Sequence, residues 1–184
     1  MREDEVYTAL HAITSKLDAM GVSYAVVGGM ALNAHGYRRT TVDVDILVTR
    51  DSSKKIHEQL DGLGYIPPFP GSRNLRDTAT GVRIEFLITG EFPGDGKPKP
   101  IAFPDPATAS VEIDGIRYLR LENLIELKLA SGMTNPNRLK DLADVQELIR
   151  TLRPDRSLGE RLHEYVRPRF YELWDGLQNE PPER

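Results

Sequence analysis

The chain has 184 residues, of which 39% are hydrophobic and 28% are charged, and its formal net charge is −4. These values are typical of a globular protein with a core, and they argue against a protein that coats nucleic acid nonspecifically. No apolar run approaches the ~20 residues that cross a bilayer, and the first ten residues lack a signal-peptide pattern, so we expect a cytoplasmic protein. Cysteine is absent, which excludes disulfides and thiolate sites and favours magnesium over zinc as a metal.

The first half of the chain predicts helices and strands in alternation. Apolar residues at helical spacing indicate amphipathic helices, and strict alternation of polar and apolar residues indicates strands. In chain order the pattern predicts a helix over 6–20, a strand over 24–27, a short helix ended by Gly36, a strand over 41–48, a helix over 51–63 and a strand over 81–89. Leu63 is expected on the apolar face of the second long helix, which Gly64 ends.

The second half begins with an irregular segment and becomes helical. Residues 90–106 are dense in proline and glycine and predict a long loop, which is often functional in a compact domain. Asp114 and Gly115 lie between two alternating runs, which predicts a two-residue hairpin. Helical periodicity follows from Leu121 onward. We therefore expect a sheet-containing core over 1–119 and a helical part over 120–184.

The stretch from Tyr24 to Val48 carries the first functional signal. Gly28 and Gly29 follow a strand and precede a helix, a position where backbone amides can approach a phosphate; the alternative is a tight turn. Asp43 and Asp45 alternate with Val44, so both carboxylates project from one face of a strand. Two such carboxylates repel unless a cation lies between them, which suits magnesium; the alternative is an exposed acidic strand.

Three further polar residues extend this hypothesis. Glu85 lies on the other predicted strand, where it is either a third metal ligand or the surface partner of Arg83. Lys128 falls within the apolar stripe of a helix, so it either reaches a cleft beside the sheet or extends out of the core. Asp141 and Arg138 fall within the buried arc of the next helix, where an ion pair is as plausible as a catalytic role.

These motifs together resemble the signature of the DNA polymerase β-like nucleotidyltransferase superfamily. The run from Val26 to Val48 is similar to the glycine-pair and Asp-x-Asp pattern of bacterial abortive-infection toxins of the AbiEii-like type. The segments containing Lys128 and Asp141 are similar to the C-terminal motifs of that group. The resemblance implies an α+β fold, with a small mixed sheet flanked by helices and a helical C-terminal part. It also implies magnesium and transfer of a nucleoside monophosphate from a nucleoside triphosphate such as ATP.

The resemblance also assigns roles to individual residues. Gly28 and Gly29 would cradle the triphosphate, and Asp43, Asp45 and Glu85 would bind magnesium. Lys128 would contact phosphates, with Asp141 as a supporting base or as the partner that orients it. Arg39 and Thr41 would belong to the nucleotide site by shaping the loop before the metal strand. Two residues depart from the pattern: Met30 stands where a hydroxyl is common, and Glu85 stands where aspartate is usual.

The acceptor of the transferred group is open. The resemblance includes transfer to RNA, to antibiotic hydroxyls and to partner proteins, so the chain would be a nucleotidyltransferase, for example the toxin of a toxin–antitoxin pair acting on tRNA. A catalytically weakened member or an antitoxin-like partner is the alternative. The arginines between Arg150 and Arg169 would suit an RNA backbone or a solvated helix face. Partners would then include a cognate antitoxin, or a second copy packed on Val166, Phe170, Leu173 and Trp174.

Overall fold

The structure is a computed structural model that describes residues 3–179. Within this range one mixed sheet has the strand order β3-β4-β5-β2-β1-β7-β6. The strands are β1 (Ala25–Val27), β2 (Asp43–Val48), β3 (Tyr65–Ile66), β4 (Leu75–Asp77), β5 (Arg83–Ile88), β6 (Ser110–Ile113) and β7 (Ile116–Leu119). β2 and β5 pair in parallel at the centre of the sheet, whereas β1 pairs with β2 in antiparallel orientation.

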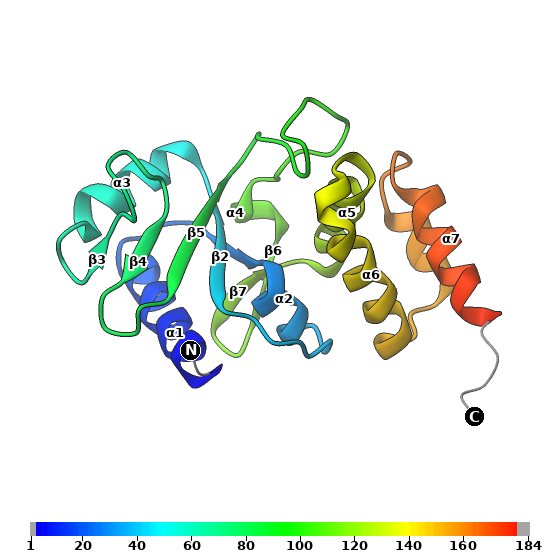
Figure 1. Cartoon of the computed structure of the whole chain (residues 1–184), viewed down its shortest axis with the longest axis horizontal. Coiled ribbons are helices and arrows are strands. Elements are labelled where there is room, and N and C mark those ends of the chain that lie inside the picture. The colour runs from blue at the N-terminus through cyan, green and yellow to red at the C-terminus, as the bar shows by residue number, and fades with distance from the viewer. Residues whose placement is uncertain (1–2, 180–184) are drawn as a thin grey trace.

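Helices cover the sheet and extend beyond it. They are α1 (Glu3–Ala19), α2 (Gly28–Ala34), α3 (Arg50–Leu60), α4 (Pro106–Ala109), α5 (Leu121–Thr134), α6 (Leu139–Leu152) and α7 (Arg167–Gln178), with two 3-10 turns, η1 (Pro136–Arg138) and η2 (Arg156–Arg161). α5, α6 and α7 lie side by side at one end of the molecule, and the segment between β5 and α4 arches over toward α5 (Figure 1).

The two faces of β2 and β5 differ in character because side chains alternate along each strand. Val44 and Ile46 of β2 are fully buried, as are their partners on β5, Ile84 and Phe86. Phe86 contacts the ring of His57 on α3 edge to face, so this apolar face is the one that α3 covers. The acidic residues Asp43, Asp45 and Glu85 project from the opposite face, which remains partly open.

The predicted α+β fold is confirmed. The hairpin turn at Asp114 and Gly115 is also confirmed, since both residues have positive φ, as a two-residue turn of this kind requires. All described strands precede residue 120 and α5 to α7 follow it, although two separate domains stay a prediction. In the described part of the chain no helix is long and apolar enough to cross a membrane.

Some element boundaries differ from the prediction. The helix expected over 51–63 ends at Leu60, and Leu63 lies 70% exposed in the turn that follows. Strands β3 and β4 form between the two predicted strands, in a region too rich in proline and glycine to show alternation. The final helix begins only at Arg167, with Pro168 in its first turn, where a missing N–H costs nothing.

The apolar residues of the C-terminal segment pack within the chain. Val166 and Phe170 are fully buried in the core, and Leu173 and Trp174 pack against it. The indole N–H of Trp174 donates to the carbonyl of Pro154 at 3.0 Å, which fixes α7 to the end of α6. These contacts account for the apolar spacing without a second copy, so a homodimer through this surface stays a prediction.

Candidate active site

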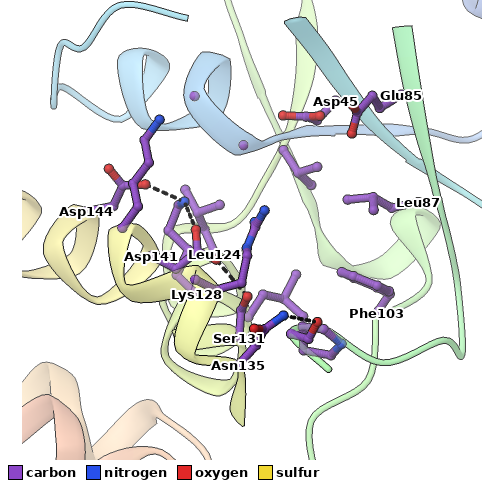
Figure 2. A pocket seen from close by; sticks show the side chains of 18 of the residues that line it. Asp45, Glu85, Leu87, Phe103, Leu124, Lys128, Ser131, Asn135, Asp141 and Asp144 are labelled. Carbon is purple, nitrogen blue, oxygen red and sulfur yellow. Dashed lines mark hydrogen bonds and ion pairs between the residues drawn. The ribbon is translucent and has the colours of Figure 1, made fainter. Parts of the chain in front are cut away.

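A cleft of about 1000 Å³ separates the open face of the sheet from α5 and α6. Its lining includes all but one of the predicted site residues, namely Gly28, Gly29, Arg39, Asp43, Asp45, Glu85, Lys128 and Asp141. Thr41, the exception, lies just behind Gly29. Figure 2 shows Asp45 and Glu85 on the sheet side and Lys128, Asp141 and Asp144 on the helices, with Leu124 beside the helical residues and Leu87 and Phe103 across from it. The cleft therefore has an acidic sheet side and a helical side on which Lys128 lies between two carboxylates, with apolar residues on both sides.

The register of β2 and β5 places the three acidic residues together. Asp45 is the direct neighbour of Glu85 across the parallel pair, and Asp43 is the neighbour of Arg83. Arg83 forms ion pairs with both Asp43, at 3.2 Å, and Glu85. No described side chain forms an ion pair with Asp45, which leaves the central carboxylate without a direct cationic partner.

Asp45 responds to this environment by favouring its protonated form. Burial, together with the nearby carboxylates of Glu85 and Asp43, raises its pKa from 3.8 to about 7. The more distant cations Lys128 and Arg138 oppose this shift but do not cancel it. A carboxylate that is partly shielded from water and has like-charged neighbours is in the electrostatic condition that a bound cation relieves.

Glycine is required at both positions of the pair, because the carboxylate of Asp45 and the side chain of Thr41 lie close to the backbone there. Gly28 has φ +63°, and a Cβ at this position would lie 2.0 Å from Oδ2 of Asp45. A Cβ on Gly29 would lie 2.9 Å from the side chain of Thr41. Because both residues also open α2, their backbone lies beside the acidic residues at a helix N-terminus. Only glycine allows this approach.

A network of ion pairs forms the helical side of the cleft. Nζ of Lys128 donates to Asp141 at 3.0 Å and to Asp144 at 2.7 Å, so the lysine bridges α5 and α6. Asp141 also accepts hydrogen bonds from Ser131 at 2.7 Å and from Nε of Arg138 at 2.9 Å. Burial opposes ionisation of Asp141, but the Lys128 ammonium and the Ser131 hydroxyl outweigh it and hold its pKa below the usual value. These contacts suit Asp141 as an orienting partner better than as a base.

Arg39 connects this network to the loop before β2. Its guanidinium donates to both carboxylate oxygens of Asp144, at 2.6 and 2.7 Å, and Asp144 is almost fully buried. The backbone N–H of Arg39 donates to Oδ1 of Asn33 at 2.8 Å, and Thr41 donates to the carbonyl of Asp43 at 3.2 Å. The loop is therefore held at both ends while one side of Arg39 faces the cleft.

The donor chemistry fits magnesium, although the carboxylates are not prearranged around a point. Within residues 3–179 no group of three or more His, Cys, Asp or Glu side chains forms a ready-made metal site. Carboxylate oxygens are the ligands that Mg²⁺ prefers, and Asp43, Asp45 and Glu85 share one face of adjacent strands beside a wide cleft. The role of these three residues as metal ligands stays a prediction.

Two expectations about side-chain positions are wrong. Met30, expected beside a triphosphate, is 1% exposed and packs in the core, because α2 turns its side chain away from the cleft. Arg138 was expected in a buried arc, but it lies in η1 with its side chain 57% exposed. The missing hydroxyl at position 30 therefore changes no side chain that lines the cleft.

The structure adds residues that were not predicted for the site. Arg83 is two positions before Glu85 on β5 and hence on the same face, and Asp144 is one helical turn after Asp141. Both spacings are visible in the sequence, but only the contacts show that these residues meet the predicted ones. Asn135 and the 90–96 segment complete the cleft, and Asn135 donates to the carbonyl of Gly94 at 3.1 Å.

The arginines between 150 and 169 are largely engaged with their own chain. Arg156 pairs with Asp175 at 2.9 Å and lies over the ring of Tyr171. Arg161 pairs with Glu122 on α5 at 3.0 Å. Arg167 donates to backbone carbonyls at the end of η2. This pattern supports the solvated-face interpretation over the RNA-binding one.

Comparisons with known proteins identify solved structures with a similar fold. No protein-family model and no curated protein sequence matches the chain. The solution structure of the antibiotic-resistance factor ANT(2'')-Ia is similar with a TM-score of 0.62 at 15% identity, covering 96% of this chain and 97% of that one. Its crystal structure in complex with adenylyl-2''-tobramycin gives a TM-score of 0.57 at 14% identity, covering 91% and 97% of the two chains.

A third solved structure supports the same fold. An antigenic nucleotidyltransferase-like protein from Paracoccidioides brasiliensis is similar with a TM-score of 0.55 at 20% identity, covering 82% of this chain and 78% of that one. The AbiEii-like type is not among these similarities. At such identities the likeness concerns the fold, and the chain therefore has the fold of nucleotidyltransferases.

Proposed function

We propose that the chain is a magnesium-dependent nucleotidyltransferase that moves a nucleoside monophosphate from a nucleoside triphosphate to a hydroxyl acceptor. The observation that carries this proposal is the juxtaposition of Asp45 and Glu85 on adjacent parallel strands with Gly28 against Asp45. Lys128 stands across the same cleft. An isolated glycine turn or acidic strand would not need this arrangement, whereas phosphoryl chemistry needs all three parts.

Backbone groups and side chains of the cleft have different roles in this proposal. The backbone N–H groups at Gly28 and Gly29 approach the triphosphate, and Lys128, held by Asp141 and Asp144, supplies a fixed positive charge. Asp43, Asp45 and Glu85 would hold magnesium, which neutralises charge that develops on the phosphates. The acceptor hydroxyl loses its proton to solvent as its oxygen bonds to the α-phosphorus. The bond from that phosphorus to the bridging oxygen breaks, and pyrophosphate leaves.

The acceptor is proposed by class only. Transfer to an antibiotic hydroxyl is favoured by the fold likeness to ANT(2'')-Ia over nearly the full length of both chains. Transfer to tRNA by a toxin, or to a partner protein such as a cognate antitoxin, is the remaining proposal from the sequence. Arg156 and Arg161 each form an ion pair with a carboxylate of the same chain, so they add no support for a tRNA acceptor.

The test is transfer of label from nucleotide to acceptor. The protein is incubated with magnesium and each α-labelled nucleoside triphosphate, in separate reactions with tRNA, whole-cell protein and aminoglycosides. We expect label on one acceptor class, and loss of transfer in Asp43→Ala. Transfer that survives this substitution would contradict the proposed site. Nucleotide binding without transfer would favour the binding-module alternative, and neither binding nor transfer would contradict the enzyme proposal.

A further inference from the structure

Arg83 is in contact with two of the three carboxylates that the proposed function assigns to magnesium. Its guanidinium pairs with Asp43 at 3.2 Å and also with Glu85. The strand register explains this geometry, because Arg83 is the direct neighbour of Asp43 and lies two residues before Glu85 on one face. One positive side chain therefore satisfies two negative ones on adjacent strands.

The ion pairs of Arg83 with Asp43 and Glu85 are exposed to solvent and can therefore break. The side chain of Arg83 is 45% exposed, and those of Asp43 and Glu85 are each 30% exposed. Ion pairs with this exposure are weak, since water solvates both partners after separation. The neighbouring Asp45 stays outside the guanidinium's ion pairs, so Arg83 compensates only part of the acidic group.

A divalent cation and the guanidinium compete for the same oxygen atoms. Magnesium requires carboxylate oxygens in close to octahedral geometry, and oxygens that accept hydrogen bonds from Arg83 are not free to take that geometry. Binding of the metal to Asp43 and Glu85 hence requires Arg83 to turn toward the open cleft that it also lines.

We propose that Arg83 is an internal counter-ion of the candidate metal site: it pairs with Asp43 and Glu85 and offsets part of their charge while no metal is bound, and it leaves them when a divalent cation arrives. This inference rests on the proposed function, because it takes these carboxylates as metal ligands. Arg83 thereby sets how tightly the site holds its metal and keeps the acidic face from destabilising the fold without it.

The direct test is Mn²⁺ affinity, measured by titration with electron paramagnetic resonance. We expect Arg83→Gln to bind Mn²⁺ about 2- to 30-fold more tightly than the wild type, the range that two exposed ion pairs correspond to. Arg83→Lys keeps the charge and should stay close to the wild type. Arg73→Gln is the matched control, because Arg73 lines the same cleft but pairs with Glu91 at 2.6 Å.

The outcomes separate the two proposals. Tighter binding in Arg83→Gln alone supports the counter-ion role. Equal tightening in Arg73→Gln would show a general effect of charge in the cleft and would overturn it, as would unchanged or weaker binding in Arg83→Gln. If all variants bind Mn²⁺ alike, only this inference fails. If none binds Mn²⁺, the metal chemistry of the proposed function fails as well.

The melting temperature, measured in EDTA and again with added Mn²⁺, tests the same role of Arg83. In EDTA, Arg83→Gln should melt at lower temperature than the wild type, because Asp43 and Glu85 lose their partner. Added Mn²⁺ should raise the melting temperature of Arg83→Gln more than that of the wild type. A variant that melts like the wild type in EDTA and gains no more from Mn²⁺ would contradict the counter-ion role.

Discussion

Asp45 lies where burial and two like-charged neighbours oppose its ionisation, and Gly28 lies where a single added carbon would strike it. Both residues carry a local cost to stability. The environment of Asp45 on β2 disfavours its charge, and position 28 must be glycine because a side chain there would clash with the Asp45 carboxylate. Such local costs are characteristic of functional sites, because a fold selected for stability alone would avoid them.

The pKa of Asp45 predicts how stability depends on pH. Its folded pKa of about 7 exceeds the usual aspartate pKa of 3.8, so the folded state binds the extra proton between these pH values. The free energy of unfolding should therefore fall as pH rises from about 4 to about 7 and then level off. Asp45→Asn removes this cost. In EDTA we expect the variant to match the wild type near pH 4 and to be about 4 kcal/mol more stable at pH 8.

Urea denaturation across that pH range measures the effect, with added Mg²⁺ as the control. Magnesium should stabilise the wild type at pH 8 more than Asp45→Asn, since the amide removes one of the three carboxylate charges that the metal would neutralise. A stability difference that is independent of pH would show that Asp45 is not held in an unfavourable environment.

Gly28→Ala separates contact from backbone strain. The new Cβ would clash with Asp45 and would also occupy positive φ, whereas Gly62→Ala has positive φ with nothing within 4 Å. Both variants should lose about 1–2 kcal/mol to the backbone conformation. Only Gly28→Ala should also lose nucleotide binding in a calorimetric titration. Equal nucleotide affinity in both variants would place the nucleotide elsewhere.

At the scale of elements, α5, α6 and the loop before β2 are joined by charges rather than by apolar contacts alone. Lys128 bridges Asp141 and Asp144, and both oxygens of Asp144 accept hydrogen bonds from one terminal nitrogen of Arg39. Buried pairs of this kind contribute little when compared with an apolar replacement, but removing one member leaves the others uncompensated. The network thus fixes the position of Lys128 relative to the sheet, which is what a phosphate contact needs.

Removal of Asp144 should reveal that coupling. Asp144→Ala leaves Arg39 without its bidentate partner and Lys128 with Asp141 alone, and we expect a loss of about 3 kcal/mol. Asp175→Ala, which removes the half-exposed partner of Arg156, should cost less than about 1 kcal/mol. Urea denaturation of both variants compares them. Similar small losses would mean that the network is not energetically important.

The loop between β5 and α4 is anchored to the end of α5 at Gly94. A Cβ there would lie 2.3 Å from Oγ1 of Thr134, whereas Gly96, also at positive φ, has open space around it. Gly94→Ala should therefore release the loop from α5, and Gly96→Ala should only strain its own backbone. We expect faster amide hydrogen exchange over residues 90–105 in Gly94→Ala alone. Equal exchange in the two variants would refute the anchor.

For the whole molecule, the sequence predicts the parts that depend on periodicity and turn chemistry. The αβ alternation, the long loop, the hairpin at Asp114 and the helical C-terminal part follow from such local signals, whereas the α+β fold was implied by the family resemblance. The meeting of Asp45 with Glu85 depends on strand order, which no local pattern encodes, yet the resemblance to a known signature anticipated both residues. Their contact in one cleft then follows from the parallel register.

What could not be predicted depends on tertiary contacts. β3 and β4 have two and three residues and exist because a neighbouring strand supplies their hydrogen bonds. Met30 follows the glycine pair in the sequence and was therefore expected beside a phosphate. The direction of its side chain depends on how α2 packs against the core, which the sequence does not reveal. Arg83 reads as a surface partner in the sequence, and only the register shows that it spans two acidic residues.

The central claim is that the triphosphate and its metal occupy the cleft between β2, β5 and α5. A crystal structure of the protein with Mg²⁺ and a non-hydrolysable nucleoside triphosphate analogue tests it most directly. We predict phosphates against the backbone at Gly28 and Gly29, a metal on Asp43 and Asp45, and Arg83 turned away from Asp43. An analogue bound outside this cleft, or bound within it with no metal at Asp43 and Asp45, would contradict the account.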